Sequence, residues 1–123
     1  MYAGRTLFIS RSQRAPNHLW ILATEPDGDP AQAVIVSFTT NRSGADQTVL
    51  IQPGEHPFVV RDTVIHYTDA RLVHVEQLTA LVASGVTRFH ADCSDDLLAR
   101  IQAGIHESPF TPHFIKGYCK GRV

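Results

Sequence analysis

Two threonines, an arginine and a histidine lie in or beside two loops, where they could bind a phosphate group and transfer protons to or from it. Thr39 and Thr40 end an apolar run, and Arg42 follows them in a polar loop. His56 lies in a Gly-Glu-His-Pro segment. An arginine can hold phosphate through two parallel hydrogen bonds, and a histidine titrates near neutrality and can give or take a proton. The same residues could also be a strand cap, a solvated charge and a turn, so both interpretations stay open.

Standard catalytic motifs do not occur in the sequence. It contains no P-loop, GxGxxG, HExxH or GxSxG string. The seven histidines are scattered, and a zinc site would have to combine His90 and Cys93 with a third ligand. We therefore expect no metal and no cofactor. Cys93 and Cys119 show no CxxC spacing and are expected to be free thiols in a reducing cytoplasm.

Short β-branched and aromatic runs, separated by Gly, Pro and Asp, must position the candidate side chains. Such runs are typical of the strands of an antiparallel sheet or barrel. We expect strands at residues 18–23, 33–39, 47–51, 57–60, 63–67 and 71–74. The strands precede the helices, which argues against a βαβ fold. The predicted class is α+β, mainly β: a small antiparallel barrel or a strongly bent sheet with two helices.

Two helices are expected after the strands. An apolar stripe begins at Val75 and would end at Gly85. Ser94 is the expected N-cap of the second helix, which would end before Pro109. Residues 110–123 are expected to form a packed tail or a short strand. The residues expected to share one core are Trp20, Val34, Val36, Val64 and Leu72.

The charge distribution separates the termini from the body of the chain. Residues 1–17 carry three arginines and no acid (+3), and residues 113–123 carry two lysines, one arginine and no acid (+3). The residues between them carry five arginines and twelve acids (−7). Basic termini can bind nucleic-acid phosphates or act as solvated tails. Under the first interpretation, the nucleic-acid-binding residues are Arg14, Lys116 and Lys120.

The length and hydropathy of the chain predict one soluble domain. At 123 residues it can bury its own core, with residues 1–17 as an N-terminal arm or edge strand and residues 18–123 as a single globular barrel domain. No apolar run approaches the roughly 20 residues that span a bilayer, and the first residues lack the apolar core of a signal peptide. We expect a cytoplasmic protein with no membrane partner.

The order of these elements resembles a known family. A Leu-Trp-Ile strand is followed by an Ala-Val-Ile-Val strand that ends in Thr39-Thr40, and residues 62–73 run into a Gln-Leu helix. Over about residues 18–106 this order resembles the MazF/PemK toxins of toxin–antitoxin systems. The resemblance implies an SH3-like barrel and a metal-independent RNA endoribonuclease. It also implies a homodimer that an antitoxin peptide neutralises.

The resemblance also implies roles for the candidate residues. In that family an arginine in the loop after the first strand works with a serine or threonine at the end of a following strand. Thr39 or Thr40 matches the hydroxyl, whereas residues 25–32 contain no arginine and Arg42 is the candidate near the same rim. RNA cleavage through the 2′-hydroxyl also needs a proton acceptor and a proton donor, and His56 could be either.

Two other classes of function stay open. The missing loop arginine favours a non-catalytic SH3-like module that binds a peptide or a nucleic acid. A weaker alternative is an accessory domain of a mobile element.

Overall fold

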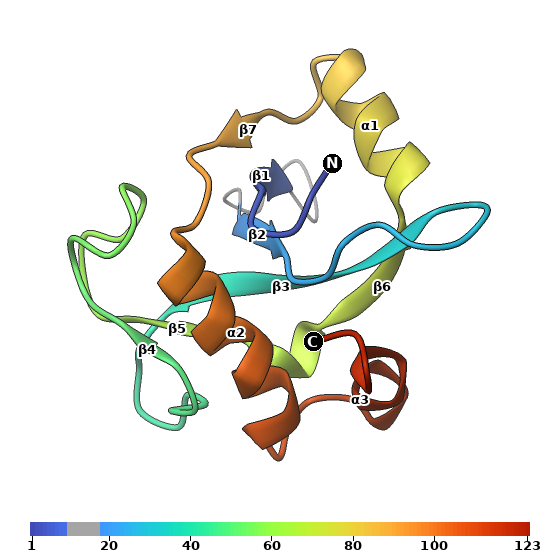
Figure 1. Cartoon of the computed structure of the whole chain (residues 1–123). Helices are drawn as coiled ribbons and strands as arrows, with labels where there is room; N and C mark the ends of the chain where they lie inside the picture. The colour runs from blue at the N-terminus through green and yellow to red at the C-terminus, as the bar shows by residue number, and fades with distance from the viewer. Residues whose placement is uncertain (10–17) are drawn as a thin grey trace.

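The computed structural model describes residues 1–9 and 18–123, which form one bent antiparallel sheet with helices against it (Figure 1). The elements are β1 (Thr6–Ile9), β2 (His18–Leu22), β3 (Gln32–Thr40), β4 (Leu50–Ile51), β5 (Thr63–Ile65), the 3-10 helix η1 (Tyr67–Asp69), β6 (Arg71–His74), α1 (Val75–Ala83), β7 (Phe89–His90), α2 (Asp95–Glu107) and α3 (His113–Cys119). The strand order is β4-β5-β3-β2-β1-β7, with β6 also paired to β3, and the sheet is not closed. The predicted α+β, mainly β class is confirmed.

β3 is the central strand, as its nearly continuous apolar sequence predicts. One edge of β3 pairs with β2. On the other edge, residues 32–35 pair with β6 and residues 38–40 pair with β5. The chain passes from β5 to β6 through η1. The end of β3 therefore lies beside β5 at one end of the sheet, next to the start of β2.

Both faces of the sheet are buried, and this corrects the expectation of one core. Val34 and Val36 face α2 and α3 in a first cluster, against which Leu72 also packs. Trp20 belongs to a second cluster on the opposite face, where Leu78 of α1 covers it. Successive side chains of a strand point to opposite faces. A strand covered on both faces is apolar throughout, which explains the composition of β3.

The two predicted helices occur where their end signals place them. The Ser94 hydroxyl accepts a hydrogen bond from the Leu97 N–H at 3.2 Å, as expected of an N-cap. Gly85, just after α1, has φ of 76°, a conformation that favours glycine. A third helix, α3, stands where a tail or short strand was predicted. Its seven residues are too few to show a clear helical period, although Ile115 and Cys119 are fully buried one turn apart.

Three predicted strands differ from the structure. Residues 57–60 form turns and bends, and in residues 47–51 only β4 pairs. The shortening of β4 follows from Asp46, whose carboxylate accepts a hydrogen bond from the Thr48 N–H at 2.9 Å in an Asx turn. β1 is not an edge strand, because it pairs with β2 on one side and β7 on the other.

Candidate functional site

A pocket of about 460 Å³ lies where β2 begins, β3 ends and the loop before β5 approaches them. In Figure 1 this is the end of β3 from which the chain continues towards β4. Its lining residues are His18, Phe38, Thr39, Thr40, Arg42, Phe58, Val60, Arg61 and Thr63. Its volume falls in the range of roughly 300–1,000 Å³ that is usual for small-molecule sites.

Three residues predicted from the sequence meet in this pocket. Thr39 and Thr40 are the last residues of β3, and Arg42 follows them. Since consecutive strand residues point to opposite faces, the two threonines border the pocket from both sides of β3. A hydrogen bond from the Asn41 N–H to the Asp62 carbonyl, at 3.0 Å, ties the loop after β3 to the loop before β5. The pocket wall is therefore fixed by backbone contacts.

Two exposed guanidinium groups give the pocket a positive charge. Arg42 comes from the loop after β3, and Arg61 comes from the loop before β5. Within residues 1–9 and 18–123, neither guanidinium has an ion-pair or hydrogen-bond partner. Arginine presents a planar fork of donors that matches the oxygens of a phosphate. The pair can thus hold an anion without first breaking a contact within the described chain.

His18 and Arg61 were not among the site residues predicted from the sequence. Each lies in or beside a segment expected to be an ordinary strand, and nothing local marks it. The signal is in the pairing: β2 and β3 are antiparallel, and the Trp20–Ser37 register brings His18 level with Thr39. A polar residue at the start of one strand therefore meets the polar end of its neighbour.

A second pocket, of about 150 Å³, shares His18 and Thr39 with the first. The remaining lining residues are Trp20, Ser37, His66 and Asp69. Nε2 of His66 lies 3.6 Å from Oδ2 of Asp69, and the His66 N–H donates to the Ser37 carbonyl at 2.9 Å. The two pockets therefore bring two histidines and two arginines to the same end of the sheet.

His56, the predicted proton donor or acceptor, does not line either pocket. It is 3% exposed, and its ring stacks edge-on against Phe38, with centroids 5.7 Å apart. Nδ1 accepts from the Phe58 N–H at 3.1 Å, and Nε2 donates to the Ala91 carbonyl at 2.7 Å. Both ring nitrogens are thus occupied in the neutral ring. His56 packs behind Phe38 and Phe58, which line the larger pocket, and its burial is at odds with proton transfer to a bound phosphate.

The burial of His56 gives a testable pH dependence of stability. Burial lowers the pKa of His56 below its usual value, the Ala91 hydrogen bond opposes this, and the neighbouring His90 adds to the lowering. Below about pH 6.5 the unfolded chain therefore binds a proton here that the folded chain does not, so stability should fall as the pH drops. Urea unfolding at pH 7.5, 6.5 and 5.5 measures the slope.

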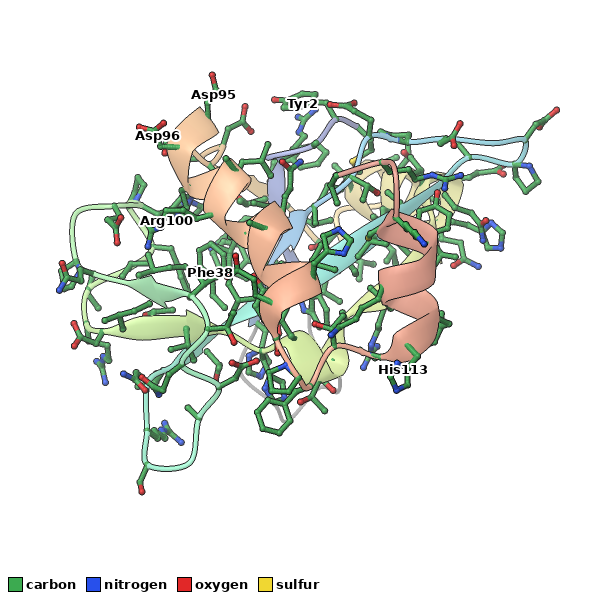
Figure 2. All side chains as sticks on the ribbon, turned by 60° about the horizontal axis from the view of Figure 1, so that its bottom comes forward. Tyr2, Phe38, Asp95, Asp96, Arg100 and His113 are labelled. Atoms are coloured by element: carbon green, nitrogen blue, oxygen red, sulfur yellow. The ribbon has the colours of Figure 1, made fainter. Side chains whose placement is uncertain are left out.

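His56→Gln should be less stable at pH 7.5 and should lose part of that slope. His113→Gln is the control, because His113 is exposed on α3 (Figure 2). Equal slopes in wild type and His56→Gln would contradict the assignment.

The loop that carries Phe58 and Arg61 is fastened to α2. The Arg100 guanidinium donates to Oε1 of Glu55 and to the carbonyl of Leu50, each at 2.5 Å. Figure 2 shows Arg100 extending from α2 towards this loop. The Gln52 N–H and then Arg100 lower the pKa of Glu55, so that it stays ionised and paired. These contacts fix the start of the loop against α2.

The predicted nucleic-acid-binding lysines lie apart from the pocket. Lys116 is half-buried on α3, and Lys120 is exposed at its C-cap. Both figures draw α3 on the opposite side of the molecule from β4 and β5. Arg14 lies outside the described residues. The structure thus does not bring these lysines together with Arg42.

The cysteines are poorly suited to nucleophilic or metal chemistry. Both are free and buried, and burial, with a contribution from Asp92, raises the pKa of Cys93 to about 12. Within the described ranges no three His, Cys, Asp or Glu side chains gather as a potential metal site, so His90 and Cys93 have no third partner there. None of the helices in that part of the chain is long and apolar enough to cross a membrane.

Comparison with known proteins gave no relative. No protein-family model matches the chain, and neither the curated proteins nor the solved structures contain a match.

Proposed function

We propose that this chain is a MazF/PemK-like RNA endoribonuclease that cleaves at the 460 Å³ pocket. One observation carries the proposal: a histidine, the threonines at the end of β3 and two arginines converge on that pocket, and neither guanidinium group has a partner among the described residues. Chemistry at a phosphodiester needs these groups within reach of one phosphate. Thr39, Thr40 and Arg42 remain candidate catalytic residues. His18 replaces His56 as the residue that transfers a proton.

The reaction uses the 2′-hydroxyl of the substrate as nucleophile. His18 accepts the proton of that hydroxyl as its oxygen forms a bond to phosphorus. Arg42 and Arg61 neutralise the charge that develops on the non-bridging oxygens, and Thr39 or Thr40 donates a hydrogen bond to them. The bond to the 5′-oxygen breaks, and that oxygen takes a proton. The products are a 2′,3′-cyclic phosphate and a 5′-hydroxyl end, and no metal takes part in these steps.

The pocket also supports recognition of a base. Phe58 is half-buried, and Val60 is 74% exposed beside the arginines. Bases stack on aromatic side chains while cations hold the backbone, which is the usual arrangement for an unpaired strand. This observation also favours a second candidate function, a module that binds RNA at the same pocket without cleaving it.

The proposal extends to the assembly implied by the MazF/PemK resemblance, a homodimer neutralised by an antitoxin peptide. Phe110 and Phe114, beside and on α3, are 57% and 63% exposed. We place the contact between subunits at these two exposed phenylalanines. Sedimentation at micromolar concentration tests the dimer.

The test of the function is cleavage of RNA with EDTA present. Wild-type protein should cut a mixed-sequence RNA and leave fragments with 2′,3′-cyclic phosphate ends, detected by mass spectrometry. The DNA oligonucleotide of the same sequence should remain intact, because it lacks the nucleophile. His18→Asn, purified in parallel, shows whether a contaminating nuclease contributes.

The outcomes separate the two candidates. If RNA binds, as measured by fluorescence anisotropy, but stays intact, the second candidate function, a non-cleaving binding module, is supported. Cleavage of the DNA oligonucleotide would contradict attack by the 2′-hydroxyl.

A further inference from the structure

We infer that the 150 Å³ pocket is the leaving-group side of the same site, and that His66 gives the proton to the departing 5′-oxygen. This inference rests on the proposed function and names the second proton-transfer group that the reaction needs. Nothing in the sequence marks His66, which directly follows β5.

The shared wall of the two pockets locates the phosphate. His18 and Thr39 line both pockets, whereas Arg42 lines only the larger and His66 only the smaller. A phosphate at His18 and Thr39 therefore has the arginines on one side and His66 on the other. In cleavage through the 2′-hydroxyl the attacking and leaving oxygens are roughly in line on opposite sides of phosphorus. The proton acceptor and donor must flank it in the same way.

The sheet sets a suitable separation between the two imidazoles. His18 is on β2, His66 follows β5, and β3 lies between these strands. Two strand spacings amount to about 10 Å between the flanking backbones. His18 is level with Thr39, and His66 is level with Ser37 on the same face. This spacing leaves room for a phosphate between the two rings.

His66 has two carboxylates near it, and its side chain is open to a ligand. Asp69 Oδ2 is 3.6 Å from its Nε2, and the His66 side chain is 43% exposed and therefore within reach of a ligand. Asp46 is a second carboxylate near it. Burial raises the pKa of Asp46, but hydrogen bonds from Ser108 and Thr48 outweigh that effect, and the charge of His66 adds to the lowering. Asp69 and Asp46 are thus the acidic side chains near His66, and His18 shares the smaller pocket with it.

The sizes of the two pockets suit this division. The larger lies within the usual range for a small-molecule ligand, and the smaller is below its lower limit of roughly 300 Å³. The smaller pocket therefore admits a fragment such as the ribose of the departing nucleotide. The base with the attacking hydroxyl belongs in the larger pocket, against Phe58.

The test compares two RNA oligonucleotides that differ at the cleaved linkage, one with the natural 5′-oxygen and one with sulfur in its place. A thiolate leaves without being protonated, so it does not need the proton donor. His66→Asn should slow cleavage of the natural linkage by about 10²–10⁴-fold and leave the sulfur linkage within a few-fold of wild type. His18→Asn should slow both. His113→Asn, on the exposed start of α3, should slow neither.

The possible outcomes test the role of His66 separately from the proposed endoribonuclease activity. Equal loss on both linkages in His66→Asn would make His66 a structural residue, and no loss would remove it from the reaction; either overturns the inference while the endoribonuclease stands. Wild type that cuts neither linkage overturns both. The ratio of the two rates does not depend on the folded fraction of a variant, so reduced stability cannot imitate the expected result.

Discussion

Replacing Arg42 by alanine should lower the RNA cleavage rate by about 10²–10³-fold, the usual loss when one preorganised donor to the transition-state charge is removed. Arg42 lines the 460 Å³ pocket and has no partner in the described part of the chain, so its guanidinium is available for the phosphate. Arg61→Ala should lower the rate in the same direction. Single-turnover cleavage measures both losses apart from RNA binding.

The controls for Arg42 separate its geometry from its charge. Arg42→Lys keeps the charge but loses the planar fork, so it should restore only part of the rate. Arg122→Ala removes the same charge elsewhere. Arg122 pairs with Asp27 at 3.0 Å across a different pocket, and the loss of a surface ion pair costs about 0–1 kcal/mol. If Arg122→Ala slowed cleavage as much as Arg42→Ala, net charge rather than the pocket would explain the effect.

The fold was predictable where the signal is local. The strand of Val34 and Val36 and the N-cap of Ser94 follow from residue type alone. Residue type does not show that Trp20 and Val34 are buried on opposite faces of the sheet. That depends on which helix covers which face. α3 was not predicted because its seven residues are too few to show a clear helical period.

The candidate site was predictable in part, for the same reason. Thr39 and Arg42 are neighbours in sequence at a strand end, so any fold that forms β3 brings them together. His18 and His66 reach the site only through the pairing of β2 and β5 with β3, which the sequence does not show directly. His56 does not line the pocket, because its loop turns the ring inward, against Phe38.

Gly104→Ala should be the most destabilising small substitution in the molecule's helices. A Cβ added to Gly104, on the buried side of α2, would overlap the Tyr67 hydroxyl and lie 2.7 Å from Tyr67 Cζ and from Val49 Cγ2. Tyr67 is fully buried and donates to the Ile101 carbonyl at 2.7 Å, so moving it costs that hydrogen bond. Overpacking costs about 1–3 kcal/mol, and the lost bond adds about 1 kcal/mol.

Gly117→Ala is the matched control for Gly104→Ala. Gly117 also lies inside a helix, α3, but a Cβ there would meet nothing within 4 Å. The Gly117→Ala variant should gain up to about 1 kcal/mol of stability from the higher helix propensity of alanine. Gly104→Ala receives the same gain, but the cost of the clash with Tyr67 is larger. Urea unfolding should therefore move the two midpoints in opposite directions. A shift of both midpoints in one direction would show that Tyr67 does not hold α2 as described.

Because Tyr67 stands between His66 and Asp69 in sequence, its displacement in Gly104→Ala should also slow cleavage of the natural linkage more than of the sulfur linkage.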